Sequence, residues 1–113
     1  MSNRNFTLHP SAAKTSSFNS ASVKATSSEI AIAVDVTATS GTPTLDIEVE
    51  YSPDGVNWAS AVSGQTIPQI TGDGVSVARF EVQAKYYRLA YTIAGGTPSL
   101  TFIVVATHFD YRK

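Results

Sequence analysis

Apolar and polar residues alternate with a period of two from position 29 onward, which is typical of strands with one buried face and one exposed face. The clearest alternation covers residues 45–51, where apolar side chains take the odd positions and carboxylates take the even ones. Three further stretches, 30–38, 87–93 and 100–106, alternate in the same way. We therefore expect each of these four stretches to form a strand.

Two stretches depart from simple alternation. In the last predicted strand the intervening residues Ile103 and Val105 are also apolar, so we expect this strand to be covered on both faces. Across residues 75–82 the apolar positions change from odd to even, and a β-bulge near Ala78 and Arg79 would explain that change. No window shows apolar residues at helical spacing between a cap and a glycine. The pattern therefore predicts an all-β fold.

A short repeat marks two corners of the predicted fold. Residues 41–45 read GTPTL and residues 96–100 read GTPSL. Glycine and proline at these positions indicate tight turns, and alternating stretches flank both of them. We expect two similar hairpins, packed in an antiparallel β-sandwich of jelly-roll or immunoglobulin-like kind.

The first 28 residues have a different composition, because Ser, Thr, Asn and Ala dominate and large apolar side chains are few. Such a segment cannot bury itself. We expect an extended N-terminal arm over residues 1–28 and a β-sandwich domain over residues 29–113. Phe6, Leu8 and Phe18 are spaced apolar anchors with which the arm is expected to bind a partner by adding a strand to its open edge.

The length and composition of the chain exclude several classes of function. A chain of 113 residues is enough for one domain with one core. It has no cysteine, which excludes disulfides, thiolate nucleophiles and thiolate metal sites. No apolar run approaches the roughly 20 residues that span a bilayer, and the N-terminus lacks the apolar core of a signal peptide. We expect a protein made in the cytoplasm that does not enter membranes.

Acidic and basic residues are concentrated in different segments of the chain. Residues 1–28 carry three basic and no acidic side chains, residues 29–73 carry seven acidic and no basic ones, and residues 74–113 carry five basic and two acidic ones. Two interpretations are open: the blocks face one another across neighbouring strands, or they pair between subunits, where opposite potentials favour encounter.

Three carboxylates, Asp46, Glu48 and Glu50, share one face of a predicted strand at steps of about 7 Å. They could form an acid pair or a loose calcium site. Both chemistries need a desolvated pocket or further ligands, and a solvated row predicts neither. We therefore expect these carboxylates to face solvent or a basic surface on a partner.

No catalytic constellation is visible. His9 lies in the arm and His108 lies at the end of the last predicted strand, on the same parity as its apolar residues, so we expect His108 to be packed. There is no Gly-x-Ser-x-Gly elbow and no phosphate-binding loop. The net charge of -1 also disfavours nucleic-acid binding. The sequence thus predicts no enzyme, no metal site and no cofactor.

The segment Tyr51-Ser52-Pro53-Asp54-Gly55-Val56-Asn57-Trp58 is the most specific local motif. It predicts a turn with an aromatic lid. The alternative is a carbohydrate-binding site, because an indole face suits a pyranose ring and Asp54 and Asn57 supply hydrogen-bonding groups beside Trp58.

Residues 30–107, with the segments SGTPTLDIEVEYSPDGVNW and KYYRLAYTIAGGTPSLTFIVVA after a Ser/Thr-rich start, resemble small virion structural proteins of tailed bacteriophages. The resemblance implies a β-sandwich of the capsid decoration or cement type, located in the virion. Its implied partners are a major capsid protein and copies of itself, often as a homotrimer. It implies no catalytic residue and no cofactor.

Overall fold

The computed structural model describes residues 3–109, with the side chains of residues 5–109, and over this range it is all-β, as predicted. The eight strands are β1 (Asn3–Lys14), β2 (Phe18–Asn19), β3 (Val23–Lys24), β4 (Glu29–Ser52), β5 (Ala59–Ser60), β6 (Thr66–Ile70), β7 (Gly74–Glu81) and β8 (Tyr86–Phe109).

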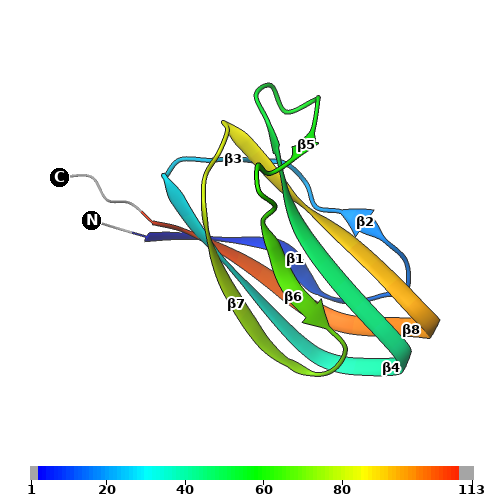
Figure 1. The fold of residues 1–113 in the computed structure, drawn as a ribbon. Coiled ribbons are helices and arrows are strands. Elements are labelled where there is room, and N and C mark those ends of the chain that lie inside the picture. Colours follow the sequence, from blue (N-terminus) through cyan, green and yellow to red (C-terminus); the bar gives the residue numbers. More distant parts are fainter. Residues whose placement is uncertain (1–2, 110–113) are drawn as a thin grey trace.

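The two long strands β4 and β8 are the frame of the fold. They pair antiparallel along their whole length, from Glu29 opposite Phe109 to Ser52 opposite Tyr86. This ribbon bends in the middle, so that its two halves face each other as the layers of an antiparallel β-sandwich (Figure 1). A β-ribbon folded on itself in this way is a jelly-roll arrangement.

Short strands extend each half of the ribbon. In one layer, here called the β1/β7 layer, β7 lies beside the first half of β4 and β1 lies beside the second half of β8. In the other, the β2/β6 layer, β5 and β6 lie beside the second half of β4, and β2 and β3 lie beside the first half of β8.

The core lies between the layers and consists of the alternating apolar residues of the two long strands. Its members on these strands are Ile30, Ile32, Val34, Val36, Leu45, Ile47, Val49, Tyr51, Tyr87, Leu89, Tyr91, Ile93, Leu100, Phe102, Val104 and Ala106. The buried positions of β4 are even before the bend and odd after it. Register shifts at residues 36–42 take up this offset, so both halves keep their apolar faces inward.

The expectation of two separate hairpins is wrong. The two Gly-Thr-Pro corners are not turns that end a strand; they lie beside each other where the ribbon bends, with Thr42 opposite Gly96. Gly41 and Gly95 have φ values of 71° and 113°, in the left-handed region that favours glycine. A Cβ on Gly95 would collide with the carbonyl oxygen of Thr42. The repeat therefore reflects two strands that need glycine at one crowded corner.

Two smaller expectations are also wrong. The pairing of β7 with β4 is uninterrupted from Glu81 to Gly74, so there is no bulge near Ala78 and Arg79. The change of parity arises because Val75 and Val77 point outward and are 68% and 65% exposed. The last strand is covered on one face only, since Ile103 and Val105 are half-buried on the outer face of the β1/β7 layer.

The N-terminal segment is extended, as predicted, but in the described residues it is part of the sandwich. β1 pairs with β8 from Asn3 to Lys14, and β2 and β3 pair with the other half of β8. The segment therefore closes one side of both layers, and residue 28 does not separate it from an independent domain.

Candidate functional site

The outer face of the β2/β6 layer carries the predicted row of carboxylates, and each member has a different partner. Asp46 accepts hydrogen bonds from the Gln69 amide at 3.2 Å. Glu48 accepts one from the Ser60 hydroxyl at 3.3 Å. The third carboxylate, Glu50, is paired within its own chain.

Glu50 forms an ion pair with Arg88, in which Nε lies 2.7 Å from Oε1 and both side chains are about three-quarters buried. A second pair joins Glu29 to Arg79 across β4 and β7 at 2.6 Å. Both pairs join the acidic middle block to the basic last block. They support the interpretation that the charge blocks face one another across neighbouring strands.

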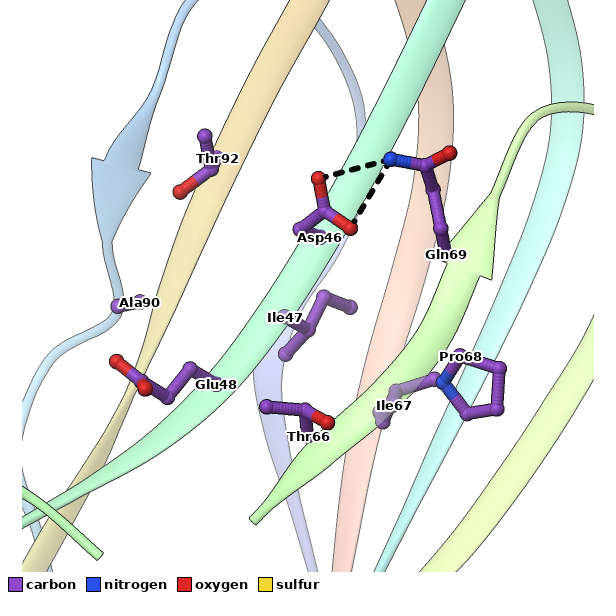
Figure 2. A pocket seen from close by; sticks show the side chains of 9 residues that line it. All are labelled: Asp46, Ile47, Glu48, Thr66, Ile67, Pro68, Gln69, Ala90 and Thr92. Atoms are coloured by element: carbon purple, nitrogen blue, oxygen red, sulfur yellow. Dashed lines mark hydrogen bonds between the residues drawn. The ribbon is translucent and has the colours of Figure 1, made fainter. Parts of the chain in front are cut away.

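A shallow groove of about 400 Å³ lies between this row and β6 (Figure 2). Figure 2 shows the Asp46 carboxylate turned toward the Gln69 amide, while Glu48 lies further along β4 and its carboxylate points away from them, toward Ala90. The hydroxyl-bearing residues Thr66 and Thr92 also line the groove. It thus offers carboxylate, amide and hydroxyl groups to a polar ligand, without an aromatic platform among its lining residues.

The loop after β4 is tied together by one carboxylate. Asp54 accepts hydrogen bonds from the Ser52 hydroxyl, from the backbone N–H groups of Val56 and Asn57, and from the Asn57 side-chain amide, at 2.9–3.0 Å. These bonds, first of all that from the Asn57 backbone, hold the pKa of the exposed Asp54 carboxyl well below its ordinary value. Asp54 therefore stabilises the conformation of the loop, and its carboxylate and the Asn57 side-chain amide are hydrogen-bonded to each other.

Trp58 returns from this loop onto the sheet. Its ring lies 4.6 Å from the guanidinium carbon of Arg88, the residue that also binds Glu50. The three proposed glycan-binding residues are brought together in one short loop, but Arg88 covers one face of the indole. Trp58 is half-buried, as expected for an aromatic lid.

The apolar residues of the N-terminal segment contact their own chain. Leu8 and Phe18 pack against the core, and Phe18 stacks on Tyr91 with ring centroids 4.4 Å apart. Phe6 lies 4.5 Å from the ring of His108. These three side chains would have to leave β8 before they could anchor a neighbour.

His108 is packed, as predicted, and 1% exposed. Its Nε2 is hydrogen-bonded to the Tyr87 hydroxyl, and its Nδ1 lies 3.2 Å from the Thr26 hydroxyl. These bonds join the N-terminal segment to both halves of β8. His108 is thus a structural residue in a hydrogen-bonded network, as expected for a buried polar group.

His9 is the buried residue that the sequence did not indicate. It is 4% exposed, and its Nδ1 lies 2.9 Å from the carbonyl oxygen of Phe102, on whose ring it stacks. Desolvation lowers the pKa of this imidazole. Its Nε2 and the hydroxyl of Tyr91 have no hydrogen-bond partner. Burial of His9 could not be expected from a segment assumed to be a free arm.

The outer face of the β1/β7 layer carries an apolar patch that sequence analysis missed. Strand register places Val77 and Val105 on either side of Ala33, and Val75 and Ile103 on either side of Asp35. We define the outer apolar patch as the six residues Ala31, Ala33, Val75, Val77, Ile103 and Val105. The signal in the sequence was the apolar odd positions of 75–77 and 103–105, which were attributed to a bulge and to a covered strand.

Metal-binding clusters and membrane-spanning helices are absent from the part of the chain that the structure describes. Within it, no group of three or more His, Asp or Glu side chains is placed to hold a metal ion, and it contains no helix that could cross a membrane. The surface features that it does show are the groove, the Trp58 loop and the outer apolar patch.

Comparisons with known proteins identify the fold. No protein-family model and no curated protein matches the sequence. Among solved structures the chain is similar to PBSX exported protein XepA, a phage-related protein, with a TM-score of 0.68 and 13% identity over 97% of this chain and 39% of that one. The chain thus spans well under half the length of XepA.

A second similar structure contains the CBM22-1 and GH10 modules of the Clostridium thermocellum N-terminal endo-1,4-β-D-xylanase 10B, solved with xylohexaose. The TM-score is 0.52 at 14% identity, over 80% of this chain and 18% of that one. At these identities both similarities establish a shared β-sandwich fold and nothing more.

Proposed function

We propose that this chain is a non-enzymatic structural protein of a phage virion, which decorates or cements the capsid by bridging neighbouring subunits. The observation that carries the proposal is the outer apolar patch. It lies on a regular sheet face, and Val75 and Val77 are each about two-thirds exposed. Contiguous exposed apolar surface on a small protein is typical of a protein-binding site.

The composition of the patch suits binding to a flat protein surface. Its β-branched residues resemble those that pack between sheets. Asp35 lies between Val75 and Ile103 on the same face, so the patch combines apolar side chains with one carboxylate, which a partner surface would meet with a polar or basic group. A small protein that binds two shell subunits at once stabilises the assembled shell by mass action.

The sequence resemblance to virion proteins and the fold shared with the phage-related XepA support the same proposal. The predicted trimer and the major capsid protein as partner belong to it as well. The N-terminal anchors contribute only if β1 and β2 separate from β8, so in this fold the sheet face takes the role first expected of the arm.

Binding of the purified chain to capsids that lack it tests the proposal, with co-sedimentation as the measurement. Val105→Lys places a charge in the patch beside Ala33 and should lower the bound fraction at least tenfold. Val56→Lys is the matched control, because Val56 is 76% exposed in a distant loop, and it should bind like the original protein. Equal binding of both variants would contradict the role of the patch.

Carbohydrate binding is the second candidate, and the groove beside Asp46 favours it. Carboxylates and amides that already point into a groove can accept and donate hydrogen bonds to sugar hydroxyls, and the xylanase structure with a similar fold contains xylohexaose. Titration with xylo-oligosaccharides, followed by NMR shifts of Gln69 and by Trp58 fluorescence, tests it. Binding lost in Asp46→Ala would support the groove, binding lost in Trp58→Ala would support the loop, and no binding would reject both.

A further inference from the structure

Asp35 is a carboxylate among apolar side chains. It lies on the outer face of the β1/β7 layer, because the even residues in this half of β4 are the buried ones. Strand register places Val75 of β7 on one side of it and Ile103 of β8 on the other. The preceding outward residue on β4 is Ala33. The Asp35 side chain is therefore half-buried beside hydrocarbon groups.

Two polar side chains of the same face are engaged elsewhere. The hydroxyl of Thr37, two residues further along β4, donates to the carbonyl oxygen of Thr101 at 3.4 Å. Arg79 lies four positions along β7 from the residue that pairs with Asp35, about 13 Å away, and it forms an ion pair with Glu29. Among the described side chains, none donates a hydrogen bond to the Asp35 carboxylate or forms an ion pair with it.

The lack of a partner distinguishes Asp35 from the other half-buried carboxylates. Three more are half-buried in the described chain, and each is bonded within it: Glu29 to Arg79, Glu48 to Ser60 and Glu50 to Arg88. A carboxylate that loses part of its hydration without a partner raises the free energy of the folded chain. The charge of Asp35 thus contributes nothing to folding, and a binding partner is the place to look for its role.

We propose that Asp35 binds a lysine or arginine side chain of the capsid surface on which the outer apolar patch docks. The inference deepens the proposed function and rests on it, because it names the chemistry of the partner. Both basic side chains have an apolar stem that can lie along Val75 and Ile103 while the cationic head reaches the carboxylate.

Charge complementarity favours a cation over a neutral group. The six residues of the outer apolar patch carry no charge, so docking removes water from Asp35 without supplying a counter-ion from this chain. A full positive charge is needed to offset that desolvation, and an apolar or acidic group opposite Asp35 would be rejected. The ion pair therefore sets which surface the patch accepts, while the apolar contacts supply affinity.

Asp35→Val distinguishes a cationic partner from an apolar one. This variant makes the face around Val75 and Ile103 wholly apolar, so an apolar partner surface would bind it more tightly. A partner cation would instead be left buried and unpaired. We expect binding to capsids that lack the chain, measured by co-sedimentation, to weaken roughly tenfold in Asp35→Val and about fivefold in Asp35→Asn.

Asp73→Asn is the matched control, because it removes the same charge from an exposed turn residue outside the patch. It should change binding by less than about twofold. Raising the salt concentration from about 0.1 M to about 0.5 M should weaken binding of the original chain more than that of Asp35→Asn, since salt screens the ion pair. The thermal unfolding midpoint of Asp35→Val should be no lower than that of the original chain, because a half-buried unpaired carboxylate is removed.

Equal or tighter binding of Asp35→Val, or the same salt dependence in the original chain and Asp35→Asn, would overturn the inference. If Val105→Lys still weakens binding in that case, the proposed function stands without it. Failure of the original chain to bind capsids would reject both. Self-association of the isolated chain that is lost in Asp35→Asn would also overturn the inference, because a second copy would then supply the cation.

Discussion

The β1/β7 layer has two edges, and they are built on different principles. β1 lies along β8 with two register shifts around His9 and carries Pro10 and Lys14. β7 has none of these features. Proline, lysine and bulges make an edge a poor template for another strand, so β1 is a closed edge and β7 an open one.

The two edges also differ in how they are held. β1 and the segment that follows it are fixed by rings, since His9 stacks on Phe102 at 4.3 Å and Phe18 on Tyr91 at 4.4 Å. The inward side chains of β7 are half-buried, and two of them, Ala78 and Phe80, pack against the core. Both edges thus contribute to the core, and the closed edge adds the stacked rings.

Proline substitutions in β7 should give the largest effect on stability. They test whether the even residues donate their N–H groups to β4 while those of the odd residues point away from it. Ala78→Pro removes an N–H that bonds to β4 and should lower the free energy of unfolding by about 3 kcal/mol. Val77→Pro removes an N–H on the free side and should cost less than about 1 kcal/mol. Urea unfolding measures both. Equal losses would contradict the assignment of the odd residues to the open edge.

Truncation of Phe18 tests the anchoring of the closed edge. Phe18→Ala removes a half-buried ring and its stacking with Tyr91, so we expect a loss of about 2 kcal/mol in the free energy of unfolding. Asn19→Ala, at the exposed neighbouring position, is the control and should change stability by less than about 0.5 kcal/mol. A loss no greater than that of the control would show that the N-terminal segment is not held by its rings.

Acid should loosen the closed edge before the open one, and this effect is the smallest. Burial lowers the pKa of His9 in the folded protein, so the unfolded chain takes up the proton first. The stability that depends on neutral His9 is therefore complete above about pH 6.5 and is lost as the pH falls below that value. The groups packed on His9 are the rings of Phe18, Tyr91 and Phe102, with Lys14 as a nearby charge.

Unfolding measured between neutral and mildly acidic pH checks this expectation. The original chain should lose more stability on acidification than His9→Gln does, and hydrogen exchange should rise in β1 more than in β7. An identical pH dependence of the two proteins would show that His9 does not contribute. The comparison isolates His9, since both proteins retain His108.

The local alternation of apolar and polar residues predicted most of the strands, but not that four of the predicted stretches join into the two long strands β4 and β8. The alternation at residues 45–51 and 87–93 set those strands and their buried faces correctly, because period-two patterning is a property of neighbouring residues. The same reasoning split β4 and β8 at their glycine corners. Whether a glycine ends a hairpin or lets a continuous ribbon bend depends on the strand opposite, and Gly41 meets Gly96 and Gly95 meets Thr42 only in the folded chain.

The candidate surfaces were predicted unequally for a similar reason. Asp46, Glu48 and Glu50 face outward as expected, and the loop of Asp54 folds around its own carboxylate. The partners of these residues, Gln69, Ser60 and Arg88, come from other strands, so no spacing rule could supply them. The outer apolar patch was not predicted. Val75 and Val77 were interpreted as the sign of a β-bulge, and Ile103 and Val105 as the sign of a strand covered on both faces.

Sequence alone determined that the chain is all-β, which faces of its main strands are buried, and where its corners lie, because these depend on residue type and on separations of one or two positions. Tertiary structure decided that the N-terminal segment closes the sandwich, that the corners share one bend, and that β7 keeps a free edge. Those features depend on pairing between residues tens of positions apart. The local sequence of a strand does not specify which other strand will form hydrogen bonds with its backbone.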